Sequence, residues 1–180
     1  MTLTVNSMPF GMNQIKVGLG TPGSETTVRT LPAGMTLKFK ERAVSGRGRG
    51  GDALVALAGA PNGVEWEMEA LGISLEAYTL MTGGTVTLTP ESAPGEADAT
   101  NVLPSNTGRN PYFNIYGKAL GVGIDDVHYV IINAKVTEGM DAPLADGEFT
   151  KSAFKGLALD WKIVQYETAA SLPADVEPGA

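Results

Sequence analysis

The sequence has no cysteine and a single histidine, His128, among its 180 residues. Without cysteine, the chain has no disulfide, thiolate metal site, iron–sulfur cluster or cysteine nucleophile. A serine–histidine–aspartate triad would have only His128 as its base, and a metal site made of several histidines is excluded. The common catalytic and metal centres that depend on these residue types are therefore excluded.

Long hydrophobic runs are also missing. No stretch approaches the roughly 20 apolar residues of a membrane-spanning helix. The first residues, Met1–Asn6, have neither the basic segment nor the apolar core of a signal peptide. We therefore expect a soluble protein that is made and kept in a cytoplasm.

Charge is distributed unevenly along the chain, whose net charge is −7. Residues 1–64 carry seven basic and three acidic side chains, whereas residues 65–180 carry six basic and seventeen acidic ones. This asymmetry predicts opposed charged patches, which suit head-to-tail association of copies, although a chance imbalance on a solvated surface is the alternative. Because the chain has this net negative charge, it is a poor candidate for binding nucleic acid over its whole surface.

The hydrophobic pattern predicts an antiparallel β domain. Apolar and polar residues alternate, or β-branched and aromatic residues gather, in Thr36–Lys40, Val64–Glu69, Thr85–Thr89, Phe113–Gly117, Tyr129–Ile132, Phe149–Trp161 and Ile163–Tyr166. Turn residues such as Asn62-Gly63 and Gly83-Gly84 separate these runs. The length suits one domain, which we place at residues 1–168.

One segment instead predicts a helix of two to three turns. Ser74 is suited to the N-cap, Glu76 to the first turn and Gly83 to the C-terminal stop. Leu75, Tyr78 and the apolar residues after them give a stripe at helical spacing.

Three further segments have no core pattern, and the first of them, residues 20–32, predicts a connection rich in glycine, proline and threonine. Residues 90–110 predict a loop of about twenty residues, a length that is usually functional or mobile. Residues 169–180 are acidic and contain proline, so we expect a flexible C-terminal tail, or an arm that a partner orders.

The glycine- and arginine-rich stretch Arg42–Asp52 is the most unusual part of the sequence. It lacks the lysine and serine or threonine of a phosphate-binding loop, and a strand pattern follows it rather than a helix. It is either a solvated hairpin tip or a basic loop that orders against an acidic neighbour, because arginine binds carboxylates in a rigid, two-pronged geometry.

Glu65, Glu67 and Glu69 form a row of carboxylates on one strand face. General acid–base catalysis needs two carboxylates in different environments, which such a row does not provide. The row is either a solvated sheet face or the acidic lining of a channel. Asp125-Asp126 beside His128 is more typical of a turn than of a metal site. We expect no catalytic, metal or cofactor site.

Trp66 and Trp161 lie in strand patterns and are suited to core or interface anchors. The alternative is that they stack on sugars, as in a monomeric β-sandwich adhesin or carbohydrate-binding module.

The succession of elements resembles the major tail proteins, or tail tube proteins, of bacteriophages with long non-contractile tails. The resemblance covers residues 10–168 and includes the stretches ISLEAYTLMTGGTVT, PYFNIYGKAL and DDVHYVIINAKVTEG. Its closing pattern G-x-F…F-x-G-x-A-x-D consists of Gly147, Phe149, Phe154, Gly156, Ala158 and Asp160.

This resemblance implies a two-sheet antiparallel β-sandwich with a short flanking helix. Six subunits would form a ring that closes a shared β-barrel, and the rings would stack into a hollow tube that conducts DNA during ejection. The segment 44–52 would be the inter-ring loop, with contacts from Arg42, Arg47, Arg49 and Asp52. The lumen would be lined by Glu65, Glu67 and Glu69, with Glu91, Glu96 and Asp98 as competing candidates.

The implied partners are further copies of the chain, a tape-measure protein and tail terminator and tip proteins. Viral DNA would pass through the lumen without specific binding. The implied location is the phage tail, after assembly in the host cytoplasm and without contact with a membrane. The N-terminal residues and the tail would be arms that order on stacking. The tube of a contractile tail or of a secretion system is the alternative.

Overall fold

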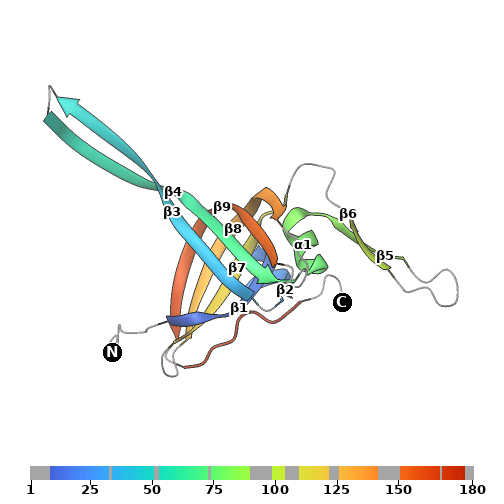
Figure 1. The fold of residues 1–180 in the computed structure, drawn as a ribbon. Coiled ribbons are helices and arrows are strands. Elements are labelled where there is room, and N and C mark those ends of the chain that lie inside the picture. The colour runs from blue at the N-terminus through green and yellow to red at the C-terminus, as the bar shows by residue number, and fades with distance from the viewer. Residues whose placement is uncertain are drawn as a thin grey trace, which may run out of the picture.

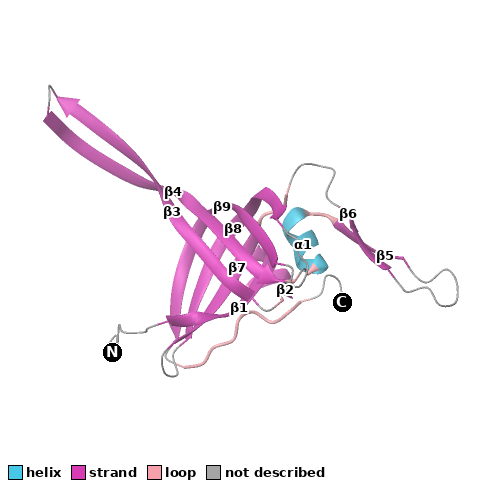
Figure 2. Ribbon diagram, viewed as in Figure 1, coloured by secondary structure: helices cyan, strands magenta, loops and turns pink. Residues whose placement is uncertain are grey.

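A computed structural model describes residues 9–32, 34–50, 53–72, 74–89, 99–103, 110–121, 126–141, 151–166 and 168–176, with the backbone alone at 9–10, 34–35, 43–50, 53–62, 88 and 121. Its elements are β1 (Pro9–Thr21), β2 (Ser24–Thr30), β3 (Gly34–Gly50), β4 (Ala53–Leu71), α1 (Leu75–Thr82), β5 (Thr85–Thr89), β6 (Ala99–Leu103), β7 (Phe113–Gly121), β8 (Asp126–Asp141) and β9 (Lys151–Tyr166). The predicted fold class, mostly β with antiparallel sheets and one short helix, is confirmed (Figure 2).

Seven strands form the main sheet, in the order β2-β1-β7-β8-β9-β4-β3, and every neighbouring pair is antiparallel. The sheet is curved, so that β3 lies across from β7 and β8 (Figure 1). A Cβ atom on Gly117 of β7 would lie 2.8 Å from Leu37 of β3, and the rings of Phe39 and Tyr129 are 5.8 Å apart. In the described ladders β3 pairs only with β4, so closure into a barrel stays a prediction.

The concave face of the sheet holds the core. Along β4, Val64, Trp66 and Met68 are buried whereas the glutamates between them face outwards, because side chains alternate along a strand. The Trp66 ring meets Phe113 of β7 edge to face at 5.7 Å. Gly156 of β9 lies under this tryptophan, where an added Cβ would be 2.0 Å from the Lys135 carbonyl oxygen. Only glycine fits there.

The predicted helix is confirmed as α1. The Ser74 hydroxyl accepts a hydrogen bond from the Ala77 amide at 3.2 Å, and Gly83 ends the helix with a φ of 71°. Ala77, Leu80 and Met81 are buried against the core. None of the described helices is long and apolar enough to cross a membrane.

Three of the predicted boundaries are wrong. Residues 24–30, inside the predicted 20–32 connection, form β2. Residues 99–103, inside the predicted 90–110 loop, form β6, which pairs with β5 in a separate two-stranded sheet. The two predicted final strands are one, β9, which runs without interruption through Trp161. These errors have one cause. The strands are completed by hydrogen bonds to a neighbouring strand, and the local sequence does not reveal that neighbour.

The C-terminal tail is also different from the prediction. Residues 170–176 lie against the sheet: Val176 forms an antiparallel bridge with Val28 of β2, and Leu172 is buried against Tyr116 and Val130. The predicted flexible tail is therefore, up to Val176, bound to its own chain, while residues 177–180 lie outside the described residues.

Candidate assembly surface

The far parts of β3 and β4, residues 43–50 and 53–62, pair as a long hairpin that extends beyond the sheet (Figure 1). We call it the arm. Its backbone register places Arg47 opposite Leu57 and Arg49 opposite Leu54, and its described residues pair only with each other. The predicted loop over 44–52 is therefore wrong from Val44 to Gly50, which are strand residues, and Asp52 lies outside the described residues.

The glycines of the arm concealed its strand character, although one signal was present. Ser45, Arg47 and Arg49 recur every second residue, and the return segment Ala53–Ala60 is apolar apart from its single glycine. A two-stranded hairpin without a third strand is at best marginally stable in water. A partner that packs against the arm would stabilise it.

The outer surface of β3, β4 and β9 carries both signs of charge, and we call it the charged face. It comprises Thr36, Lys38, Lys40, Glu65, Glu67, Glu69 and Lys155, which the strand register places side by side. The Lys155 ammonium lies 3.6 Å from the Glu67 carboxylate, and the Thr36 hydroxyl donates to Glu69 at 3.3 Å.

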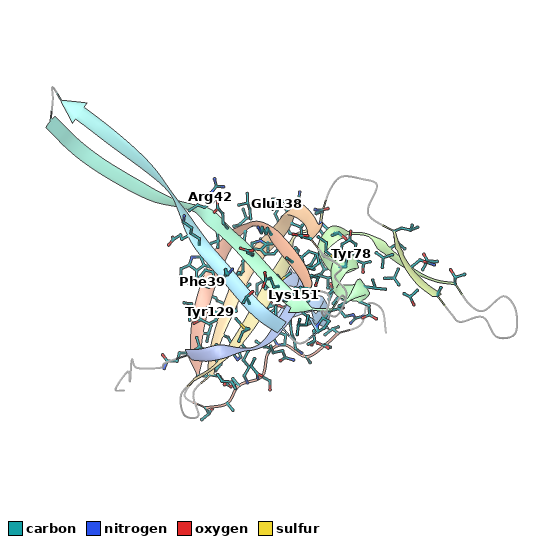
Figure 3. The ribbon with its side chains drawn as sticks, viewed as in Figure 1. Phe39, Arg42, Tyr78, Tyr129, Glu138 and Lys151 are labelled. Carbon is teal, nitrogen blue, oxygen red and sulfur yellow. The ribbon has the colours of Figure 1, made fainter. Side chains whose placement is uncertain are left out.

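Arg42 lies where the arm leaves the sheet (Figure 3). Its guanidinium is 3.2 Å from the Glu65 carboxylate, and both side chains are about half exposed. The pair contributes little to stability, because exposed ion pairs gain only about 0–1 kcal/mol. The guanidinium of Arg42 is therefore accessible to solvent on one side while it pairs with Glu65.

The structure brings the three predicted glutamates together on one face, as the alternation indicated. The basic residues Lys38, Lys40 and Lys155 beside them were not predicted, because their proximity depends on strand register. The charged face is therefore mixed rather than purely acidic. The competing residues Glu91, Glu96 and Asp98 lie outside the described residues.

Apolar side chains border the charged face on β9. Leu157 lies opposite Glu65 in the register and is 39% exposed, and Leu159 is 65% exposed. Exposed apolar groups rimmed by charges are typical of protein–protein contact surfaces.

The two tryptophans do not form an exposed platform for sugars. Trp66 is 3% exposed and lies in the core. Trp161 is half-buried, and its ring packs 5.2 Å from that of Phe39. The structure thus confirms their prediction as packing residues.

The surroundings of Asp126 are those of an ion pair. Its carboxylate lies 2.8 Å from the Lys118 ammonium, and the hydrogen bonds from Lys118 and the Ala170 amide hold the pKa of Asp126 below its ordinary value. Burial lowers the pKa of the neighbouring His128. Within the described part of the chain, no three histidine, aspartate or glutamate side chains gather as a metal site.

The chain has similarity to solved structures but not to a protein family. No protein-family model matches the sequence, and no curated protein matches it. Among solved structures, the chain is similar to a chain of the anti-feeding prophage cap, the tube terminating cap, with a TM-score of 0.45 and 13% identity over 94% of this chain and 100% of that one. A TM-score of this size is too low to show a shared fold.

Proposed function

We propose that the protein is a structural subunit of a phage tail tube, which assembles into hexameric rings that stack into a hollow tube for DNA. One observation carries the proposal: the arm leaves the domain and pairs only with itself in the described ladders. Such an arm suits a contact with another subunit. The tail-tube resemblance assigns segment 44–52 to the contact between stacked rings.

The open edge of β3 supports the same proposal. An unpaired edge strand exposes backbone N–H and C=O groups and promotes association, and joining copies into a closed barrel removes that liability. Because a head-to-tail contact joins two different surfaces, it closes into a ring or continues as a filament.

The predicted lumen lining by Glu65, Glu67 and Glu69 is part of this proposal. An acidic lining would repel DNA phosphates and let DNA slide. Their basic neighbours on the charged face would reduce that repulsion, so the lining depends on which of these side chains face the lumen. The tape-measure, terminator and tip proteins remain the partners that the resemblance implies.

Negative-stain microscopy of the concentrated protein tests the proposal directly, because it shows rings or tubes. We expect Arg47→Glu/Arg49→Glu to weaken their formation, whereas Arg47→Lys/Arg49→Lys keeps the charge and should retain most of it. A protein that stays monomeric at high concentration and at several salt concentrations would contradict a tube subunit. A sheath gene beside this gene would favour the tube of a contractile tail.

A further inference from the structure

Residues Ala170–Val176, which we call the C-terminal strap, cross the face of the sheet opposite the core. The strap starts near β7 and β8 and ends at β2, which is one edge of the main sheet (Figure 1). Its two ends are held in different ways.

At Ala170 the strap is held by a buried ion pair. The Lys118 ammonium donates to the Ala170 carbonyl oxygen at 2.6 Å, and the Ala170 amide donates to the Asp126 carboxylate at 2.6 Å. Lys118 and Asp126 are 14% and 4% exposed. Since charge-assisted hydrogen bonds at buried groups are the strong ones, this end is a firm anchor.

At the Val176 end the strap's own charged side chain is half exposed, although its partner Lys16 is buried. Asp175, whose side chain is 51% exposed, accepts hydrogen bonds from Lys16 and Thr30 at 2.9 Å. Val28 and Val176 exchange backbone hydrogen bonds of 3.0 and 3.3 Å, and Arg29 donates to the Val176 carbonyl oxygen at 2.8 Å. This end is a latch rather than an anchor.

The latch covers the β2 edge incompletely. Antiparallel pairing repeats every second residue, so an edge that presents Val28 outwards also presents Thr30, whereas the register with β1 shifts at Thr26. The strap forms one isolated bridge with β2, at Val28. Pro173 has no N–H, so it cannot donate to a longer ladder. A regular strand from another molecule would make more hydrogen bonds with β2 than the strap makes.

We propose that the C-terminal strap is a self-bound cover of the β2 edge, which a strand of a second copy displaces during assembly. The Ala170 end stays anchored while the segment from Pro173 to Val176 swings away. The strap thereby protects the edge of the solitary subunit, and assembly opens it. This inference rests on the proposed assembly of the protein into rings or tubes.

A reversible lock tests the inference. In Thr30→Cys/Asp175→Cys, the new cysteines replace two side chains in direct contact, and the chain has no other cysteine. We expect the oxidised protein to stay monomeric in light scattering and negative-stain microscopy, and dithiothreitol to restore assembly in the same sample. Mass spectrometry confirms the disulfide, and Thr30→Cys alone controls for the substitution. Assembly of the oxidised protein equal to that of the reduced protein would overturn the inference.

A weakened latch gives the opposite change and does not depend on forming a disulfide. We expect Asp175→Asn to speed hydrogen exchange at the Val28 amide about two- to fivefold in dilute monomer, the factor of a lost exposed ion pair, and to shorten the lag of assembly. Asp141→Asn, an exposed charge change at the end of β8, is the control. Faster exchange without faster assembly would also overturn the inference. If the wild type itself never assembles, the proposed function fails, and the inference fails with it.

Discussion

The strands β3 and β4 contribute both to the main sheet and to the arm, but among the described residues only their segments in the sheet pack against other elements. The part of β4 from Val64 to Leu71 lies between β3 and β9, and every second side chain of it enters the core. The described outer half, in the arm, pairs only with β3. One strand therefore packs into the core over part of its length, and in the proposed tube it would contact another subunit over the rest.

The largest effect on folding is expected in the body. Phe113→Ala should lower the free energy of unfolding by about 3–5 kcal/mol, because it leaves a cavity beside Trp66. Chemical denaturation measures this loss. The neighbouring Tyr112 is 56% exposed, so Tyr112→Ala is the matched control and should cost less than about 1 kcal/mol. Equal losses at both positions would contradict the assignment of the core face.

Acid should have the next largest effect, through the strap side of the body. Hydrogen bonds from Lys118 and the Ala170 amide lower the pKa of Asp126. At Asp175 burial alone would raise the pKa, but the hydrogen bonds from Lys16 and Thr30 lower it by more, so the pKa lies below its ordinary value. A carboxyl with a lowered folded pKa stabilises the protein fully above its unfolded pKa of about 4, and this contribution is lost as pH falls through the folded value.

Melting temperatures measured from pH 7 down to pH 2 test this dependence. In Lys118→Met, stability should fall less steeply as the pH is lowered. Without the Lys118 ammonium, burial raises the pKa of the Asp126 carboxyl in the folded protein. Lys151→Met, at an exposed lysine at the start of β9, should keep the wild-type profile. An unchanged profile in Lys118→Met would show that the ion pair does not govern the acid response.

A smaller effect is expected on the charged face. Glu65→Gln removes an exposed ion pair with Arg42 and should change the free energy of unfolding by at most about 1 kcal/mol. Denaturation at low and high salt measures it, with Glu76→Gln of α1 as a comparison, whose partner Arg29 is more buried. A loss from Glu65→Gln that persists at high salt would contradict a solvent-screened pair.

The smallest effect on folding, and the largest on assembly, is expected in the arm. Val44 and Ala60 are partners in the register, and Ala60, unlike Pro61, has an N–H for the turn, so an Asn-Gly turn in place of residues 45–59 should close a shorter hairpin. We expect an unfolding midpoint close to that of the wild type but no rings or tubes, as measured by calorimetry and microscopy. Unfolding of this variant would show that the arm belongs to the folded body.

The acidic residues of the charged face could be predicted from the sequence, but the basic residues beside them could not. The alternation in Val64–Glu69 correctly separated a buried face from an acidic one, because the period of a strand is local. The basic residues opposite those glutamates come from β3 and β9. Glu67 and Lys155 are far apart in the sequence and meet only because β4 pairs with β9. No local pattern carries that information.

The sequence by itself determined the helix and its ends, through Ser74 and Gly83, and the strand faces that form the core. These features depend on residues within a few positions of each other. Only the tertiary structure decided that the glycine-rich stretch after Arg42 is a strand, that residues 99–103 form β6, and that the C-terminal strap covers β2. The physical reason is that a strand is completed by hydrogen bonds to a partner, and the partner lies elsewhere in the chain.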